Sequence, residues 1–360
     1  MTNKFFTLIM CATVFSFISC SNNEEPLEPI KIVIEGASIA PEIGGPNEPN
    51  QVYVDLSTNT STPIRRDSWD LGFYSGTDFR VTINGSVYMA VAQLSETNID
   101  AVNSTTAEVV ALQPKVAVGT FDADNINYID SRVGDITDTA ISEISVTNSE
   151  NKVYLVNLGF EVGSTAPAVG SVAISGAARG WKKIRILRKG NNYVLQYADL
   201  DAVAHAEVEI SKNALYNFSY FSFNTASEVS VAPEKMEWDL NFTVFTNEFP
   251  NFGSYGYSDF VVNNTKSDVK VYMIDTDVDS FTYDAYSIID VDATKFTEEQ
   301  RGIGSSWRNG GGPGSLPSLK DNVFYIINDT DGNLYKLKFL ALTNQAGERG
   351  YPEFVYSLLK

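Results

Sequence analysis

The stretch Ser68-Trp69-Asp70-Leu71-Gly72-Phe73 returns later in the chain as Glu237-Trp238-Asp239-Leu240-Asn241-Phe242. One match of this length is weak, and a duplication is indicated only when further motifs recur in the same order. Further pairs do so, with offsets that drift as loops change length. They are Asp78-Phe79-Arg80-Val81 with Asp259-Phe260-Val261-Val262, Val87-Tyr88-Met89 with Val271-Tyr272-Met273, Val153–Asn157 with Val323–Asn328, and Tyr193–Leu200 with Phe354–Leu359. The sequence therefore predicts a tandem duplication, with one copy at 50–204 and the other at 205–360.

The hydrophobic pattern within each copy is that of β-strands. Val52, Val54 and Leu56 alternate with Tyr53 and Asp55. A period of two sends successive side chains to opposite faces of a sheet. Strands of this kind have one apolar face that packs in a core and a second face that carries other side chains, here Tyr53 and Asp55.

Turn residues between alternating stretches predict hairpins at 190–192 and 328–333. The stretch that most favours a helix is Ala293 to Gln300, which is long enough for one or two turns. We therefore expect an all-β fold of two tandem, mostly antiparallel β-sandwich-type domains with little helix.

Composition excludes several classes of function. The chain has 360 residues, and 26 basic against 45 acidic residues leave a formal net charge of −19. Such an acidic protein does not bind the phosphate backbone of nucleic acids. His205 is the only histidine, which leaves almost no basis for a histidine-based metal site or a hydrolytic triad. No motif singles out a pair of carboxylates for glycoside hydrolysis, so we expect a binding protein and not an enzyme.

Two stretches resemble ligand-binding loops only superficially. Asp275-Thr276-Asp277-Val278-Asp279 has the spaced carboxylates of a calcium loop, but Ser280 and Tyr286 stand where that loop needs Gly and Glu. The glycine run at 310–314 lacks the Gly-Lys-Ser/Thr ending of a phosphate-binding loop. We predict no metal site, and a nonstandard calcium site stays open.

The N-terminus has the features of a lipoprotein signal. Residues 5–17 form an almost unbroken apolar run, too short for a permanent membrane helix. It ends in Phe17-Ile18-Ser19-Cys20, which resembles a bacterial lipobox, where cleavage before the cysteine leaves that residue to carry lipid. We predict a signal peptide at 1–19, lipidation of Cys20 and a proline-rich tether at 20–49. A plain secretory peptide is the alternative.

The residues after Cys20 bear on location. Ser21-Asn22-Asn23-Glu24-Glu25 is similar to the acidic export signal of surface lipoproteins in Bacteroidetes-type bacteria. Each buried methylene of an acyl chain contributes about 0.8 kcal/mol, so several chains give a firm anchor. We expect a protein anchored in the outer membrane and facing the cell exterior, with a periplasmic orientation as the alternative.

These motifs together resemble a known family, the HmuY-type lipoproteins of Bacteroidetes. The resemblance rests on Cys20, on Trp69-Asp70 and Trp238-Asp239, and on the C-terminal stretches Tyr335–Leu340 and Pro352–Tyr356. Members of that family are all-β with one such unit, whereas here the resemblance covers about residues 50 to 360 as two units. It implies a surface protein that captures haem for iron acquisition and hands it to an outer-membrane transporter.

The haem ligands are where this sequence departs from the family pattern. Family members hold haem iron with histidines or methionines, but His205 lies at the junction between the copies. Met89 and Met273 share one strand position in the repeat alignment, and a thioether can ligate haem iron. They are the candidate axial ligands, with core packing as the alternative. The loop after Trp307, where the resemblance implies a second ligand, contains no Met, His or Cys, and ligation by tyrosine stays open.

Two hypotheses about function follow. In the first, the protein binds haem or another small hydrophobic ligand of the porphyrin type. In the second, the duplicated scaffold has lost haem ligation and binds a glycan, a peptide or an outer-membrane transporter. Trp69 and Trp238 also allow two interpretations. They could form a platform on which a ligand stacks, or they could be core residues with satisfied indole N–H groups, which is the interpretation we prefer.

Overall fold

The computed structural model describes residues 33–311 and 315–360. Within it, Val33–Lys360 forms one compact unit. Its regular structure is mostly strands in antiparallel pairs, as the alternating patterns predicted. No helix in the described part of the chain is long and apolar enough to cross a membrane. The predicted signal peptide and Cys20 lie outside the described residues.

The first of two β-sandwiches is built from the middle of the chain. Its five-stranded sheet has the order β12 (Ala206–Ile210), β11 (Asn192–Asp199), β10 (Trp181–Lys189), β7 (Val153–Asn157) and β6 (Ala90–Gln93). Its four-stranded sheet has the order β14 (Ser227–Val229), β13 (Phe218–Ser222), β4 (Leu71–Tyr74) and β5 (Val81–Ile83).

The second sandwich combines the two ends of the described chain. Its five-stranded sheet has the order β1 (Gly36–Ile39), β22 (Arg349–Leu358), β21 (Leu334–Thr343), β20 (Val323–Asn328) and β17 (Lys270–Asp275). Its four-stranded sheet has the order β16 (Gly253–Asn263), β15 (Leu240–Phe249), β2 (Asn50–Asp55) and β3 (Thr60–Arg65). The hairpins predicted at 190–192 and 328–333 are confirmed as β10–β11 and β20–β21.

Short ribbons and helical turns complete the fold. The ribbons are β8 (Phe160–Val162) with β9 (Ser175–Ala178), and β18 (Arg308–Asn309) with β19 (Ser318–Leu319). The helical segments are α1 (Ala107–Leu112) and the 3₁₀ turns η1 (Gly85–Val87), η2 (Ile99–Ala101), η3 (Ala123–Tyr128), η4 (Asn148–Glu150), η5 (Thr265–Ser267), η6 (Ile288–Asp290) and η7 (Ala293–Lys295).

The helical stretch of one or two turns predicted at Ala293–Gln300 forms only at its start, as the single 3₁₀ turn η7, and the prediction is wrong for 296–300. Phe296 leaves the helical conformation immediately after it, at φ −62° and ψ 131°. Its ring then packs edge-on against Tyr272, with ring centroids 4.8 Å apart. Burial of this aromatic pair outweighs the weak helical propensity of a short segment.

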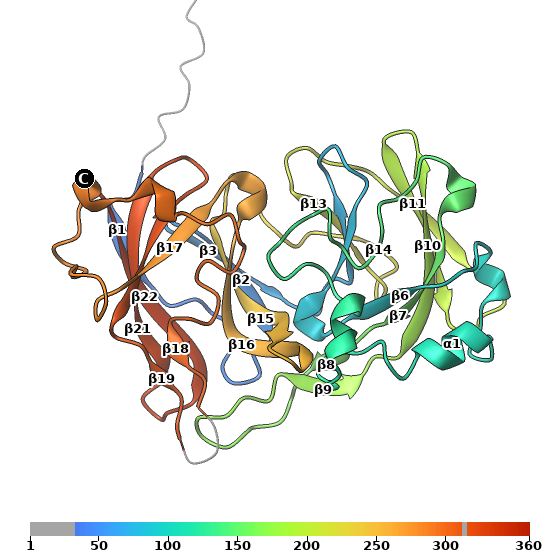
Figure 1. Cartoon of the computed structure of the whole chain (residues 1–360), viewed down its shortest axis with the longest axis horizontal. Helices are drawn as coiled ribbons and strands as arrows, with labels where there is room; N and C mark the ends of the chain where they lie inside the picture. The colour runs from blue at the N-terminus through green and yellow to red at the C-terminus, as the bar shows by residue number, and fades with distance from the viewer. Residues whose placement is uncertain (1–32, 312–314) are drawn as a thin grey trace, which may run out of the picture. The chain divides into compact units, whose positions relative to one another are not determined.

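Each sandwich is completed by strands from the other sequence copy. β2 pairs with β15, so the start of the first copy lies in the second sandwich, as does β1 before it, which pairs with β22. Conversely, β12 pairs with β11 and β13 pairs with β4. Figure 1 shows the blue strands β2 and β3 beside β15 and β16. The predicted division near residue 204 therefore separates sequence repeats, whereas the first sandwich runs from β4 to β14 and is inserted between β3 and β15 of the second.

The tether predicted at 20–49 is folded from Val33 onward, which corrects that prediction over its second half. β1 lies within it and pairs with β22. Ile39 and Ile43 are buried in the core of the second sandwich. The prolines of this stretch suggested a linker, but these apolar side chains hold it against the sheet.

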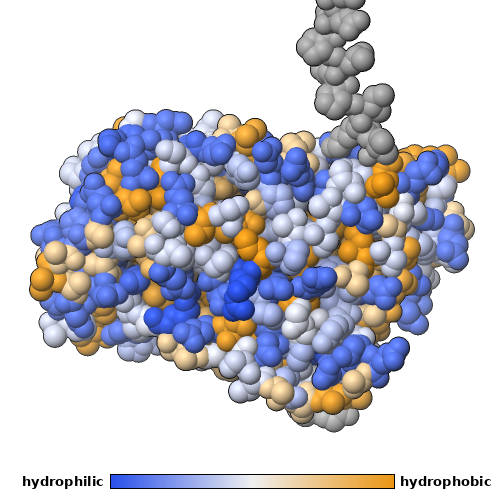
Figure 2. All heavy atoms as spheres, turned by 180° about the vertical axis from the view of Figure 1, so that it is seen from behind, coloured by the Kyte–Doolittle hydropathy of each residue, from blue (hydrophilic) through white to orange (hydrophobic). Residues whose placement is uncertain are grey.

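The surface mixes hydrophilic and hydrophobic residues. On the face drawn in Figure 2, small hydrophobic patches lie among hydrophilic side chains. Exposed apolar residues are normal on a globular protein when they are scattered. A cluster of them is more informative, and one such cluster is described below.

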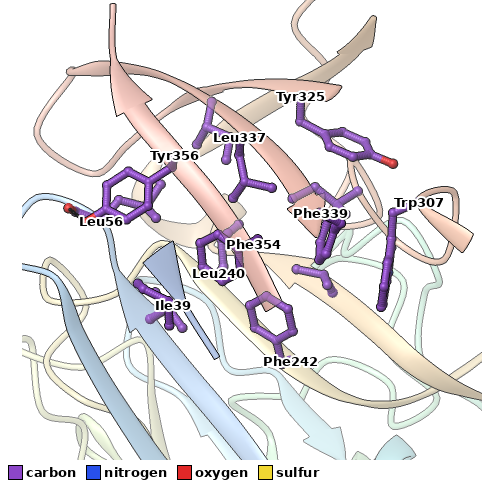
Figure 3. Packing of buried hydrophobic residues seen from close by; sticks show 14 of the residues in the cluster. Ile39, Leu56, Leu240, Phe242, Trp307, Tyr325, Leu337, Phe339, Phe354 and Tyr356 are labelled. Atoms are coloured by element: carbon purple, nitrogen blue, oxygen red, sulfur yellow. Dashed lines mark hydrogen bonds between the residues drawn. The ribbon is translucent and has the colours of Figure 1, made fainter. Parts of the chain in front are cut away.

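The exchanged strands contribute to the core of the second sandwich. Figure 3 shows Ile39 and Leu56 from the start of the chain close to Leu240 and Tyr356. The hydroxyl of Tyr356 donates to the carbonyl oxygen of Leu56 at 2.8 Å. Burying a side chain such as Leu or Ile stabilises a fold by about 1.5–3 kcal/mol, so the second sandwich depends on residues before position 66.

The aspartate of each Trp-Asp pair secures an exchanged strand. Asp239 Oδ2 accepts a hydrogen bond from Leu56 N, immediately after β2, at 2.8 Å. Asp70 Oδ2 accepts one from Phe223 N, immediately after β13, at 2.6 Å. Both carboxylates are fully buried. The motif recurs in the sequence because each copy needs this anchor.

Candidate functional site

The two four-stranded sheets carry aromatic residues on the faces that point away from the cores. Val52 and Val54 of β2 enter the core of the second sandwich, so alternation turns Tyr53 to the opposite face. That face is also buried, since Tyr53 is only 4% exposed. The Tyr53 ring meets Trp238 edge-on, with centroids 5.0 Å apart. A tyrosine of the first copy therefore packs against a tryptophan of the second.

The first sandwich repeats this contact with the copies reversed. Tyr220 of β13 lies opposite Gly72, as Tyr53 of β2 lies opposite Asn241. The Tyr220 ring meets Trp69 edge-on, with centroids 4.9 Å apart. All four rings belong to one hydrophobic cluster that also includes Val231 and Ala232.

The two tyrosines of this cluster have perturbed phenol groups. Burial, and then the neighbouring Tyr220, raise the pKa of Tyr53 well above its ordinary value. Burial also raises the pKa of Tyr220. Both phenols therefore stay neutral at physiological pH.

A cavity of about 220 Å³ lies among these residues, and side chains of both sandwiches line it. Residues that line it carry buried polar atoms without a hydrogen-bond partner among the described residues: Nε1 of Trp69, Nε1 of Trp238, Nε2 of Gln51 and Oδ1 of Asn241. Buried polar groups are nearly always paired. The tryptophans pack in a hydrophobic cluster, and neither indole N–H has a partner among the described residues.

The charged side chains that line the cavity already have partners. Asp130 accepts hydrogen bonds from Ile83 N at 2.7 Å and Ala140 N at 2.9 Å, while burial raises its pKa to about 7. Asp135 accepts from the backbone N–H and the hydroxyl of Thr137. Lys266 donates to the carbonyl oxygen of Gly134, and burial lowers its pKa. Asp135 and Lys266 carry opposite charges that offset each other, so the cavity wall offers neutral donors and acceptors with little net charge.

A second candidate site is a cluster of exposed aromatic side chains at the end of the β15–β16 hairpin, which we call the aromatic tip. It consists of Phe121, Phe249, Phe252 and Tyr255, which are 63%, 40%, 46% and 42% exposed. Phe121 lies 6.2 Å from Phe252 and 6.1 Å from Tyr255 between ring centroids, and Phe249 contacts the same two rings. Clustered apolar residues on a surface mark interaction sites.

The aromatic tip is held rigidly to a loop of the first copy. Gly119 N donates to Ser254 O at 2.9 Å, and Ser254 N donates to Asn125 Oδ1 at 2.5 Å. Gly253 is packed so closely that an added Cβ would lie 2.1 Å from the carbonyl oxygen of Asp122. Phe121, within this loop, has a left-handed backbone with φ 56°. Such strain in a bulky exposed residue is typical of a functional surface.

The structure separates the two methionines predicted as axial ligands. Met89 is fully buried in the first core and also lines the cavity. Met273 is 41% exposed on β17, an edge strand of the second sandwich. Met273 is not among the residues that line the cavity.

The repeat alignment that placed these methionines together is also wrong. Asn84 and Asn264 are the equivalent residues, because each amide donates to the carbonyl oxygen of the tryptophan in its own copy. Each also begins a 3₁₀ turn, η1 or η5, that ends in a left-handed residue. Counting from these asparagines, the residue equivalent to Met89 is Val269.

The other candidate ligands lie elsewhere. His205 is at the surface, where its Nδ1 lies 2.9 Å from Asp100 Oδ1. Trp307 is fully buried and stacks on Phe339 with centroids 4.1 Å apart (Figure 3). In the described part of the chain, no three His, Cys, Asp or Glu side chains gather as a metal ion would require.

Haem does not fit the central cavity. Ligand pockets for drug-sized molecules span about 300–1,000 Å³, and this cavity is smaller. Met89 is the only His, Met or Cys among its lining residues. The aromatic tip suits a large flat ligand better, and it contains a tyrosine, Tyr255, of the residue type that ligates iron in some haem proteins.

Sequence reasoning found the tryptophans but not the residues that meet them. Tyr53 and Tyr220 lie on the second faces of their alternating strands. With the strand exchange known, that alternation would have predicted that they face the tryptophans. The aromatic tip joins residues that are distant in sequence, and only Phe249, Phe252 and Tyr255 are neighbours along the chain. A dense run of exposed aromatics next to a turn is the signal that was available.

Comparisons of this chain with known proteins found similar solved structures and a matching family model. Solved structures similar to it include a protein from Bacteroides vulgatus described as HmuY-like and heme binding, with 11% identity, 90% of this chain and 91% of that chain covered, and a TM-score of 0.23. Apo PinO from Porphyromonas gingivitis has 12% identity over 49% of this chain and 94% of its own, with a TM-score of 0.23. The apo HmuY analog from Tannerella forsythia has 12% identity over 91% and 98%, with a TM-score of 0.24. No curated protein matches the chain.

The family assignment rests on the sequence match. A family model described as HmuY protein matches residues 47–204 and 214–356. Each matched segment begins just before an exchanged strand, β2 or β13. Because the two segments together span well over half of the sequence, the chain belongs to the HmuY family.

Proposed function

We propose that this chain is a lipid-anchored binding protein of the cell envelope that captures haem or a related porphyrin on its aromatic tip. Membership of the HmuY family supports the ligand class, since the HmuY-type lipoproteins that the sequence resembles capture haem. The single observation that carries the site is the cluster of four exposed aromatic rings, one of them on strained backbone.

The geometry of the aromatic tip suits a flat, apolar macrocycle. Phe121, Phe249 and Phe252 offer apolar rings, and covering them removes their surface from water at about 25 cal/mol per Å². Rigid attachment of the hairpin to the loop around Asn125 lowers the entropy cost of binding. Haem would supply an iron centre there, and the Tyr255 phenol would be the protein ligand in place of paired histidines or methionines.

Location and partner complete the proposal. Lipid on Cys20 would fix the protein to the outer membrane, facing outward, so that captured haem is handed to an outer-membrane transporter for iron acquisition. This role needs binding and release and no bond-making chemistry.

A haem titration of residues 33–360 tests the proposal. We expect a shifted Soret band at micromolar haem under oxidising conditions, because phenolate ligation favours ferric iron, and a weaker change after reduction. Phe252→Ala should weaken binding, since it removes an exposed ring of the tip. No Soret shift under either condition would overturn the proposal.

The second hypothesis, a scaffold that has lost haem ligation, is favoured by one observation. Met89 and Met273, the candidate axial ligands, lie in a core and on an exposed edge strand. If haem does not bind, the aromatic tip is left as a surface for an outer-membrane protein partner. Capture of one such partner by the wild type but not by Phe252→Ala would then support the second hypothesis.

A further inference from the structure

We propose that the cavity between the two sandwiches is a second binding site, for a small uncharged ring compound with acceptor oxygens, of the size of a monosaccharide. The proposal is independent of the aromatic tip. It rests on the orphaned polar atoms, the volume and the charge balance of the cavity wall.

The orphaned atoms specify the polarity of the ligand. Trp69 and Trp238 each carry an indole N–H without an acceptor, and Gln51 carries an amide N–H₂ without one. An indole nitrogen can only donate. Leaving such groups unsatisfied costs about 1–3 kcal/mol each. An occupant that brings oxygens to accept these hydrogen bonds would recover that free energy.

One acceptor without a partner indicates that the ligand also donates a hydrogen bond. Asn241 Oδ1 is buried and has no donor among the described residues. Hydroxyl groups act as both donors and acceptors, so a hydroxylated ring satisfies both kinds of wall atom. An ether or a simple ketone would satisfy the indoles alone.

The two cavity amides without partners lie on one side of the pseudo-symmetric cluster. Gln51 of β2 corresponds to Phe218 of β13, and Asn241 corresponds to Gly72, by their places opposite equivalent strands. At these two positions the β2 side is polar and the β13 side is apolar, but Thr82 and Asn217 add polar groups to the β13 side. The wall therefore offers polar groups on both sides, among apolar rings.

The charges of the wall exclude an ionic ligand. Asp130, Asp135 and Lys266 are each held by hydrogen bonds to neighbouring groups of the protein. Asp135 and Lys266 already offset each other's charge, so a charged occupant would be desolvated with little net counter-charge, which is costly. A quaternary ammonium, which aromatic cages bind in other proteins, would also leave the three N–H donors unpaired.

The volume limits the ligand to a single ring. A dry cavity of about 150 Å³ accommodates benzene, and drug-sized ligands occupy about 300 Å³ or more. At about 220 Å³, this cavity holds one six-membered ring with its substituents.

Calorimetric titration of residues 33–360 with D-glucose, D-galactose, D-mannose and N-acetyl-D-glucosamine tests the proposal. We expect at least one sugar to bind with a dissociation constant of about 1 mM or lower and to change the fluorescence of the cavity tryptophans. Indole and choline serve as an apolar ring and a cation of small size. Binding of indole or choline with no sugar bound, or no binding of any sugar at about 10 mM, would overturn the proposal.

Two variants separate recognition from structure. Trp238→Phe keeps an aromatic ring but removes one N–H, and we expect about tenfold weaker sugar binding. Trp181→Phe, in β10 and away from the cavity wall, is the matched control and should bind as the wild type does. Equal loss in both variants would overturn the assignment of the site.

Gln51→Leu gives a signature that a purely structural residue would not show. Removing a buried, unsatisfied amide should raise the melting temperature of the free protein. The same change should weaken sugar binding, because the donor is lost. A variant with lower stability and unchanged binding would overturn the role of Gln51.

Discussion

Tyr53 and Trp238 belong to different sequence repeats, yet their rings meet edge-on with centroids 5.0 Å apart. Trp69 and Tyr220 make the reciprocal contact at 4.9 Å. The exchange of strands β2 and β13 between the copies produces both contacts. The central cavity is therefore a product of duplication, and a single unit of this type would lack its opposite wall.

The strand exchange predicts which fragments fold. The fragment 66–232 contains every strand of the first sandwich, whereas 205–360 lacks β1, β2 and β3 of the second. Ile39, Val52 and Val54 and their neighbours bury apolar surface worth about 1.5–3 kcal/mol per side chain. The summed free energy of burying these side chains approaches the whole free energy of unfolding of a domain, about 5–15 kcal/mol.

We therefore expect cooperative thermal unfolding for 66–232 and none for 205–360, measured by near-ultraviolet circular dichroism. Adding residues 33–65 as a separate peptide should restore the transition of a 233–360 fragment. A folded 205–360 fragment would show that the copies are self-sufficient.

Tyr255 is expected to change the haem spectrum if it is the iron ligand. Tyr255→Phe removes the phenol oxygen and keeps the ring, so we expect the Soret band to move towards that of free haem while weak binding persists. Tyr351 is the matched control, because it is 43% exposed against 42% for Tyr255 and lies outside the aromatic tip. Identical spectra for Tyr255→Phe and the wild type would assign the iron to another ligand.

The fold was predictable to the level of strands and hairpins, because alternation and turn residues are local properties. Val52 and Val54 could be assigned to a core face from sequence alone. The strand that pairs with β2 could not be predicted, because the alternation of β2 fits a sheet of either copy equally well. The tether prediction failed for the same reason: Ile39 has a burial site only when β22 is beside it.

The candidate sites were less predictable than the fold. The Trp-Asp motif was visible, but its carboxylates secure the exchanged strands and do not bind a ligand. The position of Met89 depended on an alignment through loops of different length. Phe121 reaches the aromatic tip through backbone hydrogen bonds around Gly119, which no sequence pattern encodes.

Cys20 is expected to control the attachment of the protein to the membrane. A lipidated cysteine would place the wild type in the membrane fraction of cells, because several acyl chains bind far more strongly than one. Cys20→Ser should move the protein to the soluble fraction and leave the melting temperature of the folded part unchanged. Membrane association that survives this substitution would exclude Cys20 as the anchor.

Stability should fall as the pH rises through neutrality. Burial raises the pKa of Asp130 and of Asp239 to about 7, above the unfolded value of about 3.9. Between these values the folded protein binds more protons than the unfolded chain, so raising the pH favours unfolding. We expect the melting temperature to decrease from pH 5 to pH 8.

Asp239→Asn tests the origin of that pH dependence. The substitution removes one titrating group, so the melting temperature should vary less with pH, although the buried contacts to Leu56 N and Thr330 N weaken. Glu207→Gln, on exposed β12, is a control that should keep the wild-type slope. A melting temperature that rises from pH 5 to pH 8 in the wild type would contradict the assignment.

Met89 and Met273 should respond in opposite ways to removal of their thioethers. Met89 is fully buried in the first core, and a buried Met→Ala change costs about 2–5 kcal/mol. Met273 is 41% exposed on an edge strand, where substitutions usually change stability by about 0.5 kcal/mol or less. We expect Met89→Ala to lower the urea midpoint clearly and Met273→Ala to leave it nearly unchanged. Neither change should move the Soret band, because neither methionine belongs to the aromatic tip, where we place the haem. A Soret shift in Met273→Ala alone would instead place haem at the exposed edge of β17, and the aromatic tip would lose its assigned ligand.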